Sequence, residues 1–128
     1  MLERLSLKNQ FWYLATPYSK YPGGIEMAFQ HACEAAGELL KSGVHCFCPI
    51  AHSHPVAVRG GLDPLSHKIF IPLDAQFMTH AYGLLIVKMP GWDESKGIAI
   101  ERRFFEARMR PILELEWPKL AITPPPKS

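Results

Sequence analysis

Short apolar runs alternate with longer amphipathic segments along most of the chain. Four runs have the length and composition of buried strands, at residues 11–15, 44–50, 82–89 and 111–115. Three segments between them repeat apolar residues at helical spacing, at residues 25–42, 66–80 and 98–109. This alternation predicts an α/β fold with a parallel sheet of four to five strands and helices on both of its faces.

Three residues mark expected helix boundaries. Gly43 stands where a glycine closes a helix, and Ser95 stands where a serine hydroxyl caps the first turn of one. Pro72 lies inside the second helical segment. It predicts that this helix begins close to it, because proline is tolerated in a first turn.

Polar loops follow the first three predicted strands, at residues 16–24, 51–64 and 89–95. Ligands of parallel sheets bind beyond the carboxyl ends of the strands, so we expect these loops to form one crevice. The middle loop is long, and long loops in small domains are usually functional or mobile. We predict a single domain over residues 1–118 and a proline-rich, extended tail over residues 119–128.

The turn and helix after the third predicted strand hold the main catalytic candidate. Gly97 and Glu101 share a helix face, and helical side chains lean towards the helix N-terminus. The Glu101 carboxylate should therefore point over Gly97 into the crevice, as a nucleophile or base. A structural role is equally open, since the helix dipole also stabilises an early acid. Asp74 and Asp93 are the other acids that could reach the crevice and serve as a proton donor.

Composition and charge narrow the classes of partner. Fourteen basic and twelve acidic residues among 128 leave a formal charge of +2, which is too balanced to predict a nucleic-acid partner. No apolar run approaches the roughly 20 residues that span a bilayer, and the first residues lack the apolar core of a secretory signal. Three cysteines do not make a disulfide framework. We therefore expect a cytoplasmic protein with no membrane partner.

A metal site could be suggested from Cys46, Cys48, His52 and His54. Their spacing is not a standard zinc pattern, and the cysteines fit a buried strand better. The two histidines follow a strand end, where they could contact a ligand or fix the loop by hydrogen bonds. The G-x-G-x-x-G and P-loop motifs are absent from the sequence. We expect no metal and no cofactor.

Several segments resemble a known group of proteins. They are Tyr13-Leu-Ala-Thr-Pro-Tyr-Ser19, Pro49-Ile-Ala-His-Ser-His-Pro55, Asp74, and Gly91-Trp-Asp-Glu-Ser-Lys-Gly97 with Glu101. From about residue 13 to about residue 115, the chain resembles a bacterial family of uncharacterised proteins. That family is similar to the nucleoside 2-deoxyribosyltransferases and the deoxynucleoside 5′-monophosphate N-glycosidases. Ser95 matches the glycosidases better, because the transferases carry an acid at this position.

The resemblance implies a flavodoxin-like (Rossmann-like) three-layer sandwich that assembles as a dimer or tetramer. It implies that Glu101 attacks C1′ of a nucleoside or nucleotide while Asp74 helps to protonate the leaving base. Water or a second base then takes the sugar, which makes the protein a hydrolase or a transferase without a cofactor. The expected substrate-binding residues, from the loops and from the resemblance, are Tyr13, Ala15, Pro17, Tyr18, Ser19, His52, His54, Asp93, Ser95 and Gly97.

Three functional hypotheses stay open at the level of the sequence. The first is an N-glycosidase or deoxyribosyltransferase that uses Glu101. The second is a non-catalytic nucleotide-binding protein on the same fold, which would still bind its ligand after Glu101→Gln. The third is a metal-dependent enzyme that uses His52 and His54.

Overall fold

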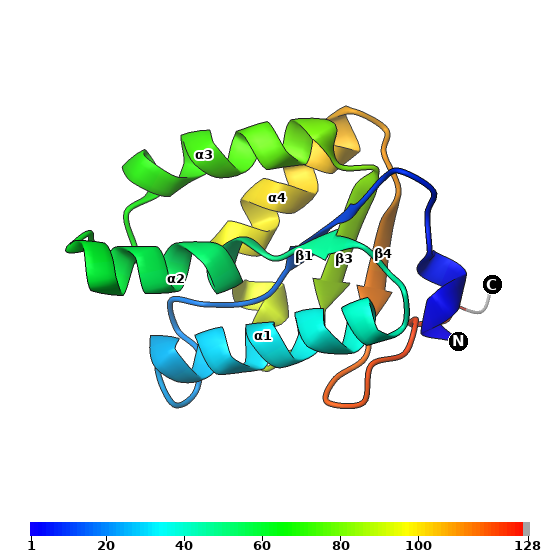
Figure 1. The fold of residues 1–128 in the computed structure, drawn as a ribbon, viewed down its shortest axis with the longest axis horizontal. Coiled ribbons are helices and arrows are strands. Elements are labelled where there is room, and N and C mark those ends of the chain that lie inside the picture. The colour runs from blue at the N-terminus through cyan, green and yellow to red at the C-terminus, as the bar shows by residue number, and fades with distance from the viewer. Residues whose placement is uncertain (127–128) are drawn as a thin grey trace.

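The protein is an α/β sandwich built on one parallel sheet (Figure 1). The computed structural model describes residues 1–126. The sheet has four strands in the order β2-β1-β3-β4, and every neighbouring pair is parallel. The strands are β1 (Trp12–Ala15), β2 (Cys46–Phe47), β3 (Gly83–Val87) and β4 (Ile112–Leu115). The predicted flavodoxin-like three-layer sandwich is confirmed, with four strands.

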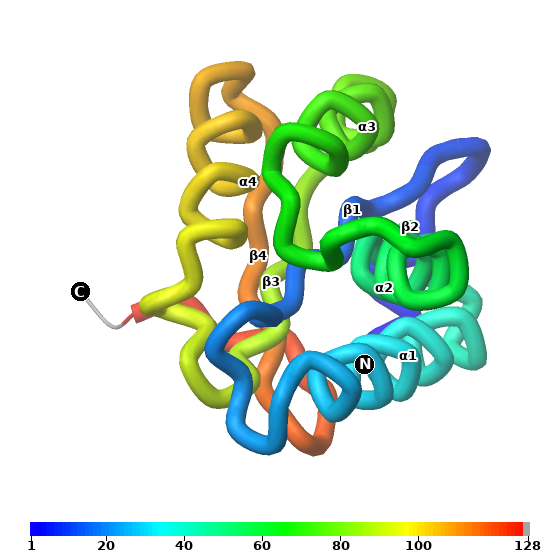
Figure 2. Tube along the Cα trace, turned by 90° about the vertical axis from the view of Figure 1, so that its left-hand side faces the viewer, coloured from blue at the N-terminus to red at the C-terminus, as the bar shows by residue number. Residues whose placement is uncertain are grey.

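Within residues 1–126, four helices cover the sheet, and two short 3-10 turns precede strand β1 and helix α4. They are η1 (Leu2–Leu5), α1 (Ile25–Lys41), α2 (Pro49–Gly60), α3 (His67–His80), η2 (Trp92–Glu94) and α4 (Lys96–Ala107). Leu85 and Val87 of β3 pack in the apolar cluster that contains α1 and the start of α2. Leu84 and Ile86, which alternate with them, pack in the cluster that contains residues of α3 and α4. Figure 2 shows the helices on the two sides of the sheet.

The strand order places a topological switch point between β1 and β3. The chain passes from β1 to β2 on one side, and then crosses to β3 and β4 on the other. Both central strands are buried along their whole length. In doubly wound sheets the loops diverge at such a point and leave a crevice beyond the strand ends.

Helix α2 corrects the sequence-based prediction for residues 44–64. We expected a strand to residue 50 and a long loop from residue 51, but β2 ends at Phe47 and a helix occupies Pro49–Gly60. Pro49 is the first helical residue, a position that proline favours, and it does not end a strand there. Buried His54 and Ala57 hold the helix onto the rest of the fold.

Helix α3 (His67–His80) confirms the helix predicted over residues 66–80, whereas the alternative start near Pro72 is wrong. Ser66 caps the helix, because its hydroxyl accepts a hydrogen bond from the Ile69 amide at 3.3 Å. Pro72 stays within the helix and has no amide hydrogen to donate back along it. The Ser66 cap, and not Pro72, therefore marks where this helix starts.

The other element boundaries agree with the sequence to within two residues. Gly43 follows α1 with a φ of +79°, and the Ser95 hydroxyl accepts from the Ile98 amide at 3.2 Å at the start of α4, so both boundary signals are confirmed. Helix α4 runs over 96–107 and not over 98–109.

The expected extended tail folds back onto the sheet for its first few residues. Ile122 forms an antiparallel bridge with Leu115, and the Thr123 amide donates to the Glu114 carbonyl at 2.8 Å. Residues 127 and 128, the end of the predicted tail, lie outside the described residues. Within residues 1–126, none of the helices has the length and apolar character needed to span a bilayer.

Candidate active site

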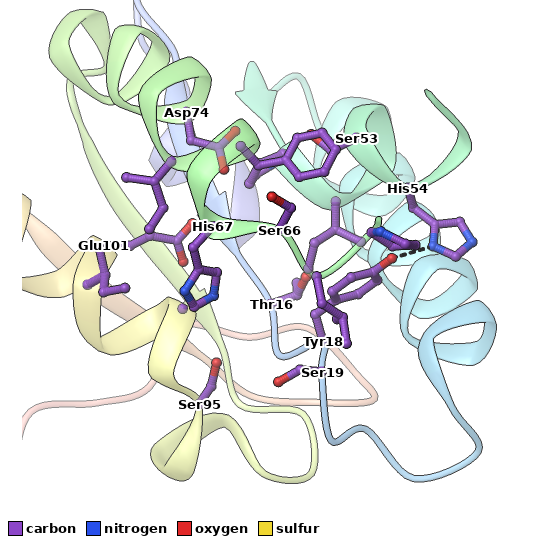
Figure 3. Close-up of a pocket in the computed structure, with 18 of the residues that line it drawn as sticks. Thr16, Tyr18, Ser19, Ser53, His54, Ser66, His67, Asp74, Ser95 and Glu101 are labelled. Carbon is purple, nitrogen blue, oxygen red and sulfur yellow. Dashed lines mark hydrogen bonds between the residues drawn. The ribbon is translucent and has the colours of Figure 1, made fainter. Parts of the chain in front are cut away.

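A pocket of about 310 Å³ opens at the switch point of the sheet (Figure 3). This volume suits a small molecule, at the lower end of the range of ligand pockets. Its walls come from the β1–α1 loop, helix α2, the α2–α3 connection, helix α3 and the first half of α4. The lining residues with polar side chains are Thr16, Tyr18, Ser19, Ser53, His54, Ser66, His67, Asp74, Ser95 and Glu101.

Helix α4 delivers Glu101 to this pocket. The Ser95 cap fixes the first turn, and Gly97 and Glu101, one turn apart, both line the cavity. A Cβ atom added at Gly97 would meet only the Ser95 hydroxyl, at 3.8 Å, within a 4 Å radius. The structure therefore has open space over Gly97, on the helix face that carries the carboxylate.

Burial controls the protonation of Glu101. The residue is partly buried, and it lines the pocket. Desolvation raises the pKa of Glu101 from 4.5 to about 8, with a smaller contribution in the same direction from Asp74. The nearby Tyr13 hydroxyl opposes this rise in the pKa.

Asp74 supplies a second carboxyl group from helix α3. Desolvation raises its pKa from 3.8 to about 6. Its Oδ1 atom is buried and has no hydrogen-bond partner. Because the two carboxyl groups influence each other, they titrate as a pair, and the pair retains one proton between about pH 6 and 8.

Tyr13 lies behind Glu101 in the central strand β1. It is fully buried, and its ring packs at 6.0 Å from the ring of Phe105. Its hydroxyl makes no hydrogen bond of good geometry, yet it is close enough to Glu101 to lower the pKa of that carboxyl group. Burial, followed by the negative charge of Glu101, raises the pKa of Tyr13. Tyr13 is therefore a neutral hydroxyl that can support an ionised Glu101.

Unpaired polar atoms concentrate at this site. Within residues 1–126, four buried side-chain oxygens lack a hydrogen-bond partner, and they belong to Tyr13, Thr16, Ser53 and Asp74. Three of these residues line the pocket, and the fourth, Tyr13, faces Glu101. Buried polar atoms without partners cost free energy, so the protein gives up stability around this pocket.

His54 is buried in the pocket wall and does not resemble a free metal ligand. Its Nδ1 atom lies 2.6 Å from the Tyr18 hydroxyl, and its Nε2 atom lies 2.7 Å from a carboxylate oxygen of Glu26. His52 is exposed and its ring lies 6.4 Å from that of Phe47. Within residues 1–126, no three His, Cys, Asp or Glu side chains are grouped to hold a metal ion.

Neither cysteine near β2 has the properties of a nucleophile. Cys48 is buried, and desolvation raises the pKa of its thiol to about 12. Desolvation also raises the pKa of Cys46, to about 11. Both thiols therefore stay protonated at neutral pH and serve as packing groups.

The structure brings most, but not all, of the predicted site residues together. Those that line the main pocket are Glu101, Asp74, Tyr18, Ser19, His54, Ser95 and Gly97. Pro17 lines an adjoining pocket of about 210 Å³, and Ala15 is buried at the end of β1. His52 and Asp93 line neither of these pockets. Asp93 lies in the exposed turn η2.

Sequence reasoning missed several pocket residues. Ser53 went unnoticed because the segment around it was taken for a loop. With Pro49 as a helix start, residues 50, 53, 54 and 57 would have appeared on one helix face. Ser66 and His67 are also in the pocket wall, and the Ser66 capping position was the signal that could have placed them.

The adjoining pocket carries the nearby positive charge. Lys20 and Lys96 line it, together with Ser19 and Ser95, which also line the main pocket. Arg59 lines neither pocket. Glu94 also lines the adjoining pocket, so the side of Ser95 holds two lysines and one acid.

The fold and the site define a class of protein: a doubly wound α/β domain with two carboxyl groups in the pocket at its switch point. A family match is more specific. The family described as "Domain of unknown function (DUF1937)" matches residues 10–117, and the chain belongs to this family. No curated protein matches the chain.

Proposed function

We propose that the protein cleaves or exchanges the N-glycosidic bond of a nucleoside or nucleotide, with Glu101 as the nucleophile. The carrying observation is the pair of carboxyl groups, Glu101 and Asp74, in one pocket lined by unpaired polar atoms. Each has a raised pKa, which is how proteins keep acid and base functions available at neutral pH.

In the first step the Glu101 carboxylate bonds to C1′ of the sugar. The C1′–N bond breaks, its electron pair goes to the base, and Asp74 donates a proton to the departing base. In the second step water or another base attacks C1′ and releases Glu101, while Asp74 takes the proton back. Two carboxyl groups and one proton suffice for this sequence.

The protonation order sets a requirement on this mechanism. The pKa of Glu101 is higher than that of Asp74, so the shared proton rests mainly on Glu101. The reactive form, with Glu101 ionised and Asp74 protonated, is the minor form. Tyr13 favours this form, because its hydroxyl can donate to an ionised Glu101.

The same protonation order favours the second candidate function, a nucleotide-binding protein without catalysis. A Glu101 that stays protonated at neutral pH is a hydrogen-bond donor to a ligand and a poor nucleophile. This candidate predicts ligand binding without release of base.

Release of free base tests the proposal. Purified protein is incubated with a panel of nucleosides and 5′-monophosphates, with and without a second base as acceptor, and the products are separated by chromatography. The proposal expects base release or exchange that is lost in Glu101→Gln and retained in Glu106→Gln, an exposed acid on the same helix. Binding without release in both wild type and Glu101→Gln would instead establish the non-catalytic candidate.

The proposal includes a homo-oligomer and a cytoplasmic location, which the resemblance and the composition support. Sedimentation of the purified protein at several concentrations checks the first.

A further inference from the structure

A chain of hydrogen bonds connects the pocket wall to the protein surface. The Tyr18 hydroxyl and His54 Nδ1 lie 2.6 Å apart, and His54 Nε2 and a Glu26 carboxylate oxygen lie 2.7 Å apart. The three residues come from the β1–α1 loop, helix α2 and helix α1. Tyr18 and His54 line the pocket, whereas Glu26 does not (Figure 3).

Packing holds the imidazole of His54 in one orientation. The residue is only 4% exposed, and its ring stacks on that of Phe29 with centroids 4.6 Å apart and an interplanar angle of 19°. The ring of Tyr18 meets it edge-on at 5.7 Å and 85°. Rotation of the imidazole would break both hydrogen bonds and the stack, so each nitrogen keeps its own partner.

The chemistry of the three groups favours one direction for the hydrogen bonds. A carboxylate can only accept, so an imidazole that carries a single hydrogen holds it on Nε2 and donates it to Glu26. Nδ1 then carries a lone pair and accepts from the Tyr18 hydroxyl. Burial raises the pKa of Tyr18 to about 12, which keeps this hydroxyl protonated and able to donate. Tyr18 lines the pocket, and its oxygen keeps a lone pair that this hydrogen bond does not use.

We propose that the His54–Glu26 pair makes Tyr18 a hydrogen-bond acceptor towards the ligand, and so selects ligands that present an O–H or N–H group at this wall. The proposal rests on the proposed function, which makes the ligand a nucleoside or nucleotide. Such a ligand has two sources of this group, the hydroxyls of its sugar and the exocyclic amine of its base. Glu26 acts only through His54, and is a positioning residue.

A second tyrosine–histidine pair provides a matched control. The Tyr21 hydroxyl and His31 Nδ1 lie 2.7 Å apart, and their rings meet at 5.5 Å and 80°, almost as in the first pair. The ring of His31 lies 5.3 Å from that of Trp117. Tyr21 lines the adjoining pocket but not the main one, and His31 lines neither. His31→Gln therefore removes a similar hydrogen bond without reaching the proposed acceptor.

The imidazole nitrogens of His54 test the direction of the hydrogen bonds without any ligand. Nitrogen-15 spectra of histidine-labelled protein are recorded near neutral pH, and the His54 signals are assigned by their absence in His54→Gln. The proposal expects hydrogen on Nε2 and none on Nδ1 in the wild type, and a mixture of the two tautomers in Glu26→Gln. Hydrogen on Nδ1 in the wild type would overturn it, because Tyr18 would then donate into the pocket.

Ligand analogues test the selection. Binding of 2′-deoxyadenosine is compared by calorimetry with analogues that lack the 3′-hydroxyl, the 5′-hydroxyl or the amino group, in Glu101→Gln protein that cannot turn them over. We expect one analogue to bind about tenfold or more weakly than the parent, because it leaves the Tyr18 oxygen unpaired. That difference should vanish in Tyr18→Phe, shrink in Glu26→Gln and persist in His31→Gln.

The outcomes separate this proposal from the proposed function. The identity of the weak analogue tells whether the sugar or the base supplies the donor. The ratio of each analogue's dissociation constant to that of the parent is compared between proteins with Tyr18 and with Tyr18→Phe. If these ratios are equal, Tyr18 does not select the ligand, and nucleoside binding is unaffected by this result. If no nucleoside binds to any of the proteins, the proposed function fails, and the histidine spectra still decide the direction of the Tyr18 hydrogen bond.

Discussion

Polar groups at the amino end of the sheet are hydrogen-bonded, whereas several at the carboxyl end are not. At the amino end, the Trp12 indole donates to the Leu5 carbonyl at 2.8 Å, and Arg110 donates to the carbonyls of Met78, Thr79 and Ala81 at 2.9, 2.8 and 3.0 Å. At the carboxyl end, buried oxygens of Tyr13, Thr16, Ser53 and Asp74 have no partner. The comparison teaches that hydrogen bonds at one end stabilise the fold, while unpaired oxygens at the other end cost stability.

The largest expected effect concerns pH and the carboxyl end. Turnover should be maximal between about pH 6 and 8, the range in which Asp74 and Glu101 together hold one proton. Activity should fall about tenfold per pH unit beyond either limit, since each side loses a required protonation state. A pH profile of kcat/KM measures this. A rate that stays flat from pH 5 to 9 would remove the carboxyl pair from the mechanism.

The amino end should show the next largest effect, on stability alone. Arg110→Ala removes the hydrogen bonds that the guanidinium group donates to three carbonyls at the end of α3. We expect a loss of about 1–3 kcal/mol in the free energy of unfolding, measured by denaturant titration, with unchanged nucleoside affinity. Arg103→Ala, an exposed position on α4, is the control and should change little. Weakened binding in folded Arg110→Ala protein would mean that the two ends are coupled.

Glu101→Gln should stabilise the protein at alkaline pH. The pKa of Glu101 is raised to about 8 in the folded state, so the folded protein binds more protons than the unfolded chain above pH 4.5. The contribution of Glu101 to stability is therefore fully present below pH 4.5 and is lost as the pH rises through about 8. At pH 9 the free energy of unfolding of the variant should exceed that of the wild type by about 2 kcal/mol. This value is reduced from the one that the full pKa shift implies, because the residue opens into the pocket. Equal thermal stability of the two proteins at pH 9 would contradict the raised pKa of Glu101.

The smallest expected effect comes from filling the space over Gly97. Alanine there meets no backbone and favours the helix, so Gly97→Ala should keep or slightly raise stability. It should weaken nucleoside binding several-fold, and Gly97→Val more strongly, because the added atoms occupy the pocket. Calorimetric titration of both variants measures the effect. Undiminished binding in Gly97→Val would place the ligand elsewhere.

The sequence predicted the central strands and the Glu101 turn because their signals are local. An apolar run specifies β3, and the hydroxyl of Ser95 caps α4 from within three residues. Helix α2 was not predictable in the same way, because Pro49 can end a strand or begin a helix. What holds α2 in place comes from distant parts of the chain, through the contacts of Tyr18 and Glu26 with His54.

Some properties of the candidate site could likewise be predicted from the sequence, and others could not. The carboxyl groups of Glu101 and Asp74 could be placed from spacing and resemblance. Their raised pKa values and the unpaired oxygens of Thr16 and Ser53 follow from burial by several elements at once. Such properties depend on tertiary packing, which a linear pattern does not contain.

Trapping of the sugar on Glu101 tests the central claim most directly. The protein is mixed with a substrate identified by base release, quenched in acid within the first turnover, digested and analysed by mass spectrometry. The account predicts a peptide that contains Glu101 and carries the mass of one sugar residue, and its absence in Glu101→Gln. Base release with no sugar on Glu101, or with sugar on another residue, would contradict the assignment of Glu101 as the nucleophile.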